Sequence, residues 1–189
     1  MQKKKKRRPV VKGLLIALFA IIVVGVGAFV LVTHYYPLRY ISIIDEYSAE
    51  YGLPPELVCA VIHTESKFSE GAVSSKGASG LMQIGESTAD WLADKMNLSG
   101  FSYDQIFDPE INIRLGCYYL GMLERQYGDM EVALCAYNAG NGTVNGWLQN
   151  PAYSDDGKTL KSIPYRETQN YVKRVADNQK IYALLLKFS

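Results

Sequence analysis

The distribution of hydrophobic residues divides the chain into two parts. From residue 13 to residue 32, twenty residues follow one another without a charge and would be apolar on every side of a helix. At a rise of about 1.5 Å per residue, about 20 helical residues cross a hydrocarbon core of about 30 Å. Beyond Pro37, apolar residues recur at helical spacing between polar ones. The pattern therefore predicts a transmembrane helix at 13–33, followed by a folded body at 38–189.

The body is predicted to be all-α. No stretch alternates between apolar and polar residues as a strand would, and no repeat is visible. The polar stretch 150–162 is predicted to be a surface loop, and Pro55 is typical of a first helical turn. One domain of this length can bury a core of its own. The expected helices are 40–51, 55–66, a helix from Leu81 or from Ser87 as N-cap to Met96, 109–126, 130–138, a turn of helix within 142–149, and a last helix after Pro164 towards Phe188.

Charge is distributed unevenly between the two parts. Seven of the 20 Lys and Arg residues lie within the first twelve residues, and the rest of the chain carries 13 basic and 19 acidic residues. The positive-inside rule then keeps segment 1–12 in the cytoplasm and puts the body outside it, as in a single-pass protein of the cell membrane. The alternative is a cleaved signal peptide, whose apolar region usually has about 7–15 residues; the longer run here favours an uncleaved anchor. An acidic body argues against nucleic-acid binding, which needs a basic folded surface.

The sequence gives no indication of a metal or cofactor site. His63 and Glu65 form an H-x-E pair, but the C-x-x-C of zinc deaminases is absent. There is no H-E-x-x-H, G-x-S-x-G or P-loop pattern either, so we expect no metal, no nucleotide and no other cofactor. Three cysteines lie far apart in apolar surroundings, where they are interpreted as buried small hydrophobic residues. One disulfide between Cys117 and Cys135 is the alternative.

Glu65 is the candidate for chemistry. It follows an apolar run, 57–62, and lies near the expected carboxy-terminal end of that helix. Burial disfavours the charged form of a carboxyl, and the helix dipole opposes negative charge at this end. Such a group can stay protonated near neutral pH and donate its proton to a leaving group.

Four motifs follow one another in order: ES-x-F from Glu65, GASGLMQ from Gly77, AYNAG from Ala136, and IP with ET-x-x-YV from Ile163 to Val172. Together they resemble the catalytic domain of family 1 lytic transglycosylases, the soluble-type murein transglycosylases, whose fold is related to goose-type lysozyme. The resemblance covers about residues 40–186. It implies a lysozyme-like helical domain with a groove, and glycan strands of peptidoglycan as the substrate.

The resemblance also implies roles for single residues. Glu65 matches the family's single catalytic acid and base, and Tyr171 matches a tyrosine whose hydroxyl approaches it. Ser74 would hydrogen-bond that carboxyl or the sugar. For the apolar and glycine positions, a purely structural role in the core or the turn is the alternative. The substrate-binding positions implied are Ser66, Ser74, Gly80, Leu81, Met82, Gln83, Tyr137, Asn138, Ala139 and Tyr171.

The sequence offers no convincing second carboxylate, since Asp90 and Asp94 are more simply solvated helix residues. Most glycosidases need two carboxylates. The resemblance therefore implies non-hydrolytic cleavage between N-acetylmuramic acid and N-acetylglucosamine, with the C6 hydroxyl of muramic acid as nucleophile. Two alternatives stay open: a hydrolytic muramidase on the same fold, and a non-catalytic peptidoglycan-binding module of a cell-envelope assembly.

Overall fold

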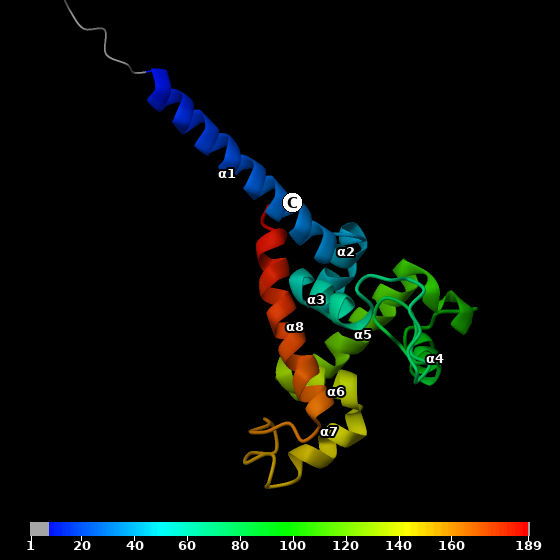
Figure 1. Cartoon of the computed structure of the whole chain (residues 1–189). Coiled ribbons are helices and arrows are strands. Elements are labelled where there is room, and N and C mark those ends of the chain that lie inside the picture. Colours follow the sequence, from blue (N-terminus) through cyan, green and yellow to red (C-terminus); the bar gives the residue numbers. More distant parts are fainter. Residues whose placement is uncertain (1–7, 189) are drawn as a thin grey trace, which may run out of the picture. The chain divides into compact units, whose positions relative to one another are not determined.

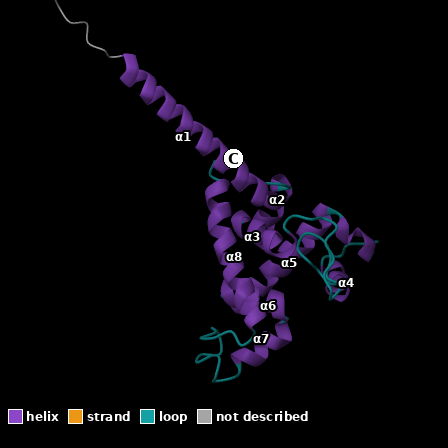
Figure 2. Ribbon diagram, viewed as in Figure 1, coloured by secondary structure: helices purple, strands orange, loops and turns teal. Residues whose placement is uncertain are grey.

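A computed structural model describes residues 8–188, and within this range the regular elements are helices only, apart from two isolated β-bridges (Figure 2). The chain divides into two units, with the boundary between Leu38 and Arg39. The all-α prediction is confirmed. Residues 1–7 of the basic amino-terminal segment lie outside the described residues, so its predicted side of the membrane stays a prediction.

The first unit contains one long helix, α1 (Arg8–Tyr35). Within its segment Val11–Tyr35, an 18-residue window has a mean hydropathy of 3.1 and no buried residue, so the helix is long and apolar enough to cross a membrane. The helix ends before Pro37, where a missing backbone N–H and a fixed φ stop helical continuation. The observed helix includes the predicted span, residues 13–33.

The second unit is the body. Its elements differ from the predicted ones mainly at short or irregular segments. Gly80–Gln83 forms turns, so the fourth helix starts neither at Leu81 nor with Ser87 as N-cap, and the short 3₁₀ helix was not predicted. Figure 1 shows the arrangement of the elements: α2 (Ile41–Tyr51), α3 (Pro55–Ser66), α4 (Glu86–Lys95), η1 (Tyr103–Phe107), α5 (Pro109–Tyr127), α6 (Met130–Ala139), α7 (Asn141–Leu148) and α8 (Arg166–Leu185).

Helix α3 lies at the centre of the body. The side chains of residues 57–62 are all buried, and α3 packs on α8 and on α2. One polar and one aromatic contact fix its carboxy-terminal half on α8. The Asn178 amide donates a hydrogen bond of 2.9 Å to Thr64 Oγ1. The His63 ring lies 5.9 Å from the Tyr182 ring. The last turn of α3, which carries Glu65, is thereby held on a long helix.

All three cysteines are free and buried, as their interpretation as small hydrophobic residues predicts. The alternative bridge between Cys117 and Cys135 does not form. Burial raises the pKa of the Cys59 thiol to about 12, so the thiol stays neutral at any physiological pH. Cys59 lies in α3, Cys117 in α5 and Cys135 in α6, each as a small buried side chain.

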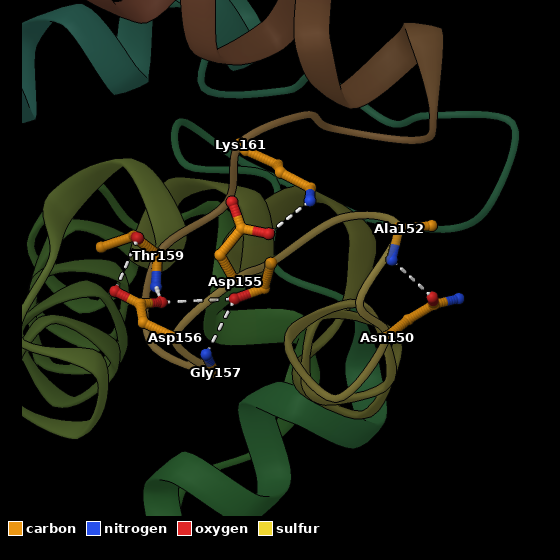
Figure 3. Close-up of polar contacts among 8 residues, drawn as sticks. Asn150, Ala152, Asp155, Asp156, Gly157, Thr159 and Lys161 are labelled. Carbon is orange, nitrogen blue, oxygen red and sulfur yellow. Dashed lines mark hydrogen bonds and ion pairs between the residues drawn. The ribbon is translucent and has the colours of Figure 1, made fainter.

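The polar loop between α7 and α8, predicted as a surface loop, is organised by its own side chains (Figure 3). The Asp156 carboxylate accepts backbone hydrogen bonds of 2.8 Å from Thr159 and from Lys158, which lower its pKa to about 2. The Ser154 hydroxyl oxygen accepts a hydrogen bond of 3.0 Å from the Gly157 backbone N–H. Lys161 pairs with the neighbouring carboxylate, Asp155. Local bonding of Asp and Ser to the backbone is the usual way in which such turns are stabilised.

Candidate active site

Glu65 occupies the last turn of α3, where the backbone changes direction abruptly. Lys67 and Phe68 both have positive φ, 53° and 63°, which residues other than glycine adopt only at a cost. The Lys67 N–H donates a hydrogen bond of 3.1 Å to the His63 carbonyl, and Phe68 is buried with its ring 6.0 Å from that of Tyr182. This buried anchor ends the helix one residue after Glu65 and leaves the carboxyl at the rim of the core.

The carboxyl of Glu65 has a strongly raised pKa. Burial raises the pKa from 4.5 to about 7, although the approach of the Tyr171 hydroxyl and the positive charge of Arg174 both act to lower it. At neutral pH the protonated and ionised forms are therefore both well populated. A group in this state can act in turn as a general acid and a general base.

The Tyr171 hydroxyl comes from α8 and faces Glu65. It is buried, and within the described residues it has no partner at normal hydrogen-bond geometry. Burial, followed by the charge of Glu65, raises the pKa of this hydroxyl well above its usual value, so it remains a neutral donor. This buried donor is directed towards the carboxyl that is expected to change charge, and its approach favours the ionised form of Glu65.

Two neighbouring cavities form one cleft. The cavity that contains Glu65 has a volume of about 230 Å³, and the second has about 300 Å³. Both are lined by Ala78, Gln83, Tyr137 and Asn138, so the two cavities adjoin. Thr88 and Tyr119 line only the second cavity, so the cleft extends from the end of α3 towards α4 and α5.

Asn112 on α5 holds the turn that forms one wall of the cleft. Its side-chain oxygen accepts a hydrogen bond of 2.7 Å from the Met82 N–H. Its side-chain nitrogen donates to the carbonyls of Ser79, at 3.2 Å, and Ile106, at 2.8 Å. Gly80 lies directly against this amide with φ of 80°, and a Cβ there would stand 2.1 Å from the Asn112 nitrogen. Asn112 therefore holds the turn by hydrogen bonds, and the packing at Gly80 leaves no room for a side chain.

Half of the substrate-binding positions implied by the resemblance lie in the cleft with Glu65. The Ser74 hydroxyl oxygen accepts a hydrogen bond of 3.0 Å from the Ala78 N–H. The Gln83 side-chain nitrogen donates to the backbone carbonyls of Ala72 and Gly80. The predicted residues that line the cleft are Ser74, Gln83, Tyr137, Asn138 and Ala139.

Of the other five positions, Tyr171 faces Glu65 from α8, and the remaining four do not reach the cleft with their side chains. Leu81 and Met82 are buried, and Met82 packs against Gly116, so the structure gives them the alternative role in the core. Gly80 supports the turn, and the Ser66 hydroxyl donates to the carbonyl of the preceding helical turn, at Ile62. Met82 still contributes through its backbone, because its carbonyl accepts a hydrogen bond of 2.8 Å from the Tyr137 hydroxyl. A tight turn directs neighbouring side chains to opposite sides, and a motif alone does not reveal which side faces the substrate.

Sequence reasoning missed several residues that build the site. Thr168, at the start of α8, is buried and donates a hydrogen bond of 2.8 Å to the Asn138 side-chain oxygen. Asn112 could have been noticed, because it shares the apolar face of its helix with Gly116 and Leu120 at intervals of four. A polar residue in such a stripe normally has buried partners. Among residues 8–188, no cluster of three or more His, Cys, Asp or Glu side chains could hold a metal ion.

The raised pKa of Glu65 predicts that stability depends on pH. Because the folded-state pKa of about 7 exceeds the ordinary 4.5, the folded state holds a proton that the unfolded state releases between these values. The free energy of unfolding should fall as pH rises from 4.5 to 8. Glu65→Gln should remove this dependence. Between pH 4.5 and 8 its free energy of unfolding should rise by about 1–3 kcal/mol relative to that of the wild type, since one pKa unit corresponds to about 1.4 kcal/mol. Urea unfolding of the detergent-solubilised chain at pH 4.5 and at pH 8 measures this dependence.

The control for this stability prediction is Asp90→Asn, which changes an exposed carboxylate on α4. It should leave the difference between the two pH values as in the wild type. An equal pH dependence in wild type and Glu65→Gln would contradict the assigned protonation state.

Comparisons with known proteins identify a family for this chain. Residues 42–160 match the family model described as "Transglycosylase SLT domain". The soluble lytic murein transglycosylase of Escherichia coli K12 is 37% identical over 143 residues, which are 74% of this chain and 22% of that protein. The membrane-bound lytic murein transglycosylase C of Edwardsiella ictaluri is 31% identical over 170 residues, covering 76% of this chain and 46% of that protein. The chain thus spans less than half the length of these curated relatives.

Solved structures resemble the body as well. An inactive mutant of the lytic transglycosylase Slt from Pseudomonas aeruginosa matches with a TM-score of 0.72 at 32% identity, over 80% of this chain and 25% of that one. A 70-kDa soluble lytic transglycosylase in complex with bulgecin A matches with a TM-score of 0.73 at 31% identity, over 82% of this chain and 26% of that one. Likeness at this level confirms the predicted lysozyme-like helical fold.

Proposed function

The chain belongs to the transglycosylase SLT family, and from this membership we propose that it cleaves the glycan strands of peptidoglycan without consuming water. The bond is the β-1,4 bond between N-acetylmuramic acid and N-acetylglucosamine, and the product carries a 1,6-anhydromuramic acid end. The observation that carries the proposal is the carboxyl of Glu65, with a pKa of about 7, in the lining of a cavity of about 230 Å³. Residues 38–189 form the catalytic domain in this proposal.

Glu65 acts twice in the proposed reaction. As an acid it gives its proton to the glycosidic oxygen, which leaves with the N-acetylglucosamine side of the strand, and the substrate's own N-acetyl group assists at the anomeric carbon. The ionised Glu65 then takes the proton of the muramic acid C6 hydroxyl as that oxygen attacks the same carbon. The buried Tyr171 hydroxyl donates to the carboxylate between the two steps. A second catalytic carboxylate is not needed in this reaction, because the muramic acid C6 hydroxyl is held close to the carbon that it attacks.

The residues of the cleft bind and orient the strand. Asn138 is held by Thr168, and Tyr137 is held by the Met82 carbonyl, so both present fixed surfaces to a sugar. Ser74 and Gln83 supply further polar groups to the lining of the cavity. Ala139 lines the second cavity, where its backbone can meet an N-acetyl group.

A specific observation favours a second candidate, a hydrolytic muramidase. Glu167 lines the same cavity as Glu65 and is a further carboxylate there. An inverting glycosidase needs such a group as the base that activates water. However, the Glu167 side chain is 71% exposed and pairs with Lys76 at 3.8 Å, so its carboxylate is solvated at the mouth of the cleft. We therefore assign it no catalytic step.

The membrane is proposed as the place of action. The apolar helix α1 and the similarity to a membrane-bound relative suggest membrane anchoring. We propose a single span with the basic amino terminus in the cytoplasm and the body outside it, because seven of the first twelve residues are basic. A body in this position would meet peptidoglycan directly.

Product analysis tests the proposed reaction. Purified peptidoglycan is digested with the detergent-solubilised chain in isotopically labelled water, and the muropeptides are analysed by mass spectrometry. We expect anhydromuramic ends without label, from the wild type and also from Glu167→Gln. Labelled reducing muramic acid would establish the hydrolytic candidate, and binding without any cleavage would establish the non-catalytic one.

A further inference from the structure

A row of aromatic side chains leads out of the cleft on the side away from Glu65. Tyr137 lines both cavities, and its ring lies 5.3 Å from that of Tyr119, which lines only the second. The Tyr119 ring is in turn 6.4 Å from that of Trp91, at an interplanar angle of 84°. Trp91 is thus the outermost member of the row and belongs to a different element, α4.

Trp91 is unusually accessible for its residue type. Its exposed fraction is 41%, whereas the other tryptophan of the chain, Trp147, is 7% exposed. The contact with Tyr119 is edge-to-face, which covers only part of a ring. Packing against Tyr119 alone therefore does not explain a large apolar ring in this position.

The position of Trp91 on α4 continues the cleft. Thr88, three residues earlier, lines the second cavity, and residues three apart in a helix lie on one face. Lys95, four residues later on the same face, has its ammonium group 6.0 Å from the Trp91 ring centroid, at the outer limit of a cation–π contact. An exposed lysine side chain can leave that position at little cost, which opens the ring face to a ligand.

We propose that Trp91 forms an additional sugar-binding subsite, on which a hexose ring of the glycan strand stacks beyond the second cavity. This inference rests on the proposed function and extends it from the bond that is cleaved to the length of strand that is recognised. The apolar face of a pyranose ring suits an aromatic surface, and the tyrosines already present in the cleft lead to that surface. A strand long enough to pass the second cavity gains the contact, and a short one does not.

Binding of β-1,4-linked N-acetylglucosamine oligomers tests this subsite. The Glu65→Gln form of the full chain in detergent is titrated with oligomers of increasing length, and Trp fluorescence is followed. We expect long oligomers to change the emission, and Trp91→Phe in the same background to abolish that change because Trp147 is buried. Trp91→Ala should weaken binding of the longest oligomer about tenfold, an effect comparable to the loss of one base stacked on an aromatic side chain, and should leave binding of the shortest bound oligomer unchanged.

Phe107→Ala is the matched control, because Phe107 is 40% exposed and lines none of the cavities described above. It should bind oligomers of every length like its parent. Equal affinities for Trp91→Ala and its parent at every length, or equal losses at every length, would overturn the subsite. If the subsite is overturned in this way but the wild type cleaves peptidoglycan, only the subsite is refuted. If the parent binds no oligomer and the wild type cleaves nothing, the proposed function is refuted as well.

Discussion

Glu65→Gln is expected to reduce peptidoglycan cleavage by about 10³-fold, because it removes the proton that the departing sugar oxygen needs. A positioned general acid and base contributes about 10²–10⁴-fold to a reaction rate. Glutamine preserves the size of the side chain and can still accept a hydrogen bond from Tyr171, so the cleft should keep its shape. The measurement is the rate of release of soluble muropeptides from purified peptidoglycan at pH 6.

The matched control is Asp90→Asn, an isosteric change of a carboxylate that lies on α4 outside both cavities. It should cleave like the wild type. The pH profile gives an independent reading: kcat/KM of the wild type should decline as pH rises through about 7, the pKa of the Glu65 carboxyl, because the acid form is lost. Full activity of Glu65→Gln would refute the assignment of the catalytic group in either enzyme class.

The prediction of Glu65 from the sequence depended on the apolar run before it and on the ES-x-F motif that begins with it. The apolar run before it predicted burial, and burial is the largest cause of the raised pKa that the structure shows. The helical spacing of apolar residues also predicted α3, α5 and α8 nearly to their ends. Long amphipathic helices repeat their pattern over several turns, so the pattern determines both their type and their buried face.

The walls of the cleft could not be predicted in this way. Leu81 and Met82 lie in a short turn, where no periodicity tells which side chain faces the core. The η1 helix has five residues, too few for a pattern. Asn112 and Thr168 act on segments 30 residues away in the sequence, and such pairings become visible only when the helices are packed. The sequence therefore identifies the reactive group, while the tertiary structure identifies what holds the substrate.

Asn112→Ala is the substitution expected to destabilise the body most. It removes the Asn112 partner of the Met82 N–H and of the Ile106 carbonyl inside the core. The Ser79 carbonyl loses one hydrogen bond but still accepts one of 3.1 Å from the Ile84 N–H. Each unsatisfied buried group costs about 1–3 kcal/mol, so the free energy of unfolding should fall by about 3–5 kcal/mol. Cleavage should fall as well, because the Met82 carbonyl holds Tyr137. Urea unfolding of the detergent-solubilised chain, followed by far-UV circular dichroism, measures the first effect.

The partner of Asn112 in this clamp, Gly80, shows whether the loss is specific. Gly80→Ala should also destabilise the body, since its Cβ would stand 2.1 Å from the Asn112 nitrogen and its φ is 80°. Gly71→Ala is the matched control, because a Cβ at Gly71 meets nothing within 4 Å. In the double variant the side-chain clash is absent, so its cost should be smaller than the two single costs together, as for residues in direct contact. Additive costs would mean that Asn112 and Gly80 stabilise the turn independently, and the clamp would then not be the unit that shapes the cleft.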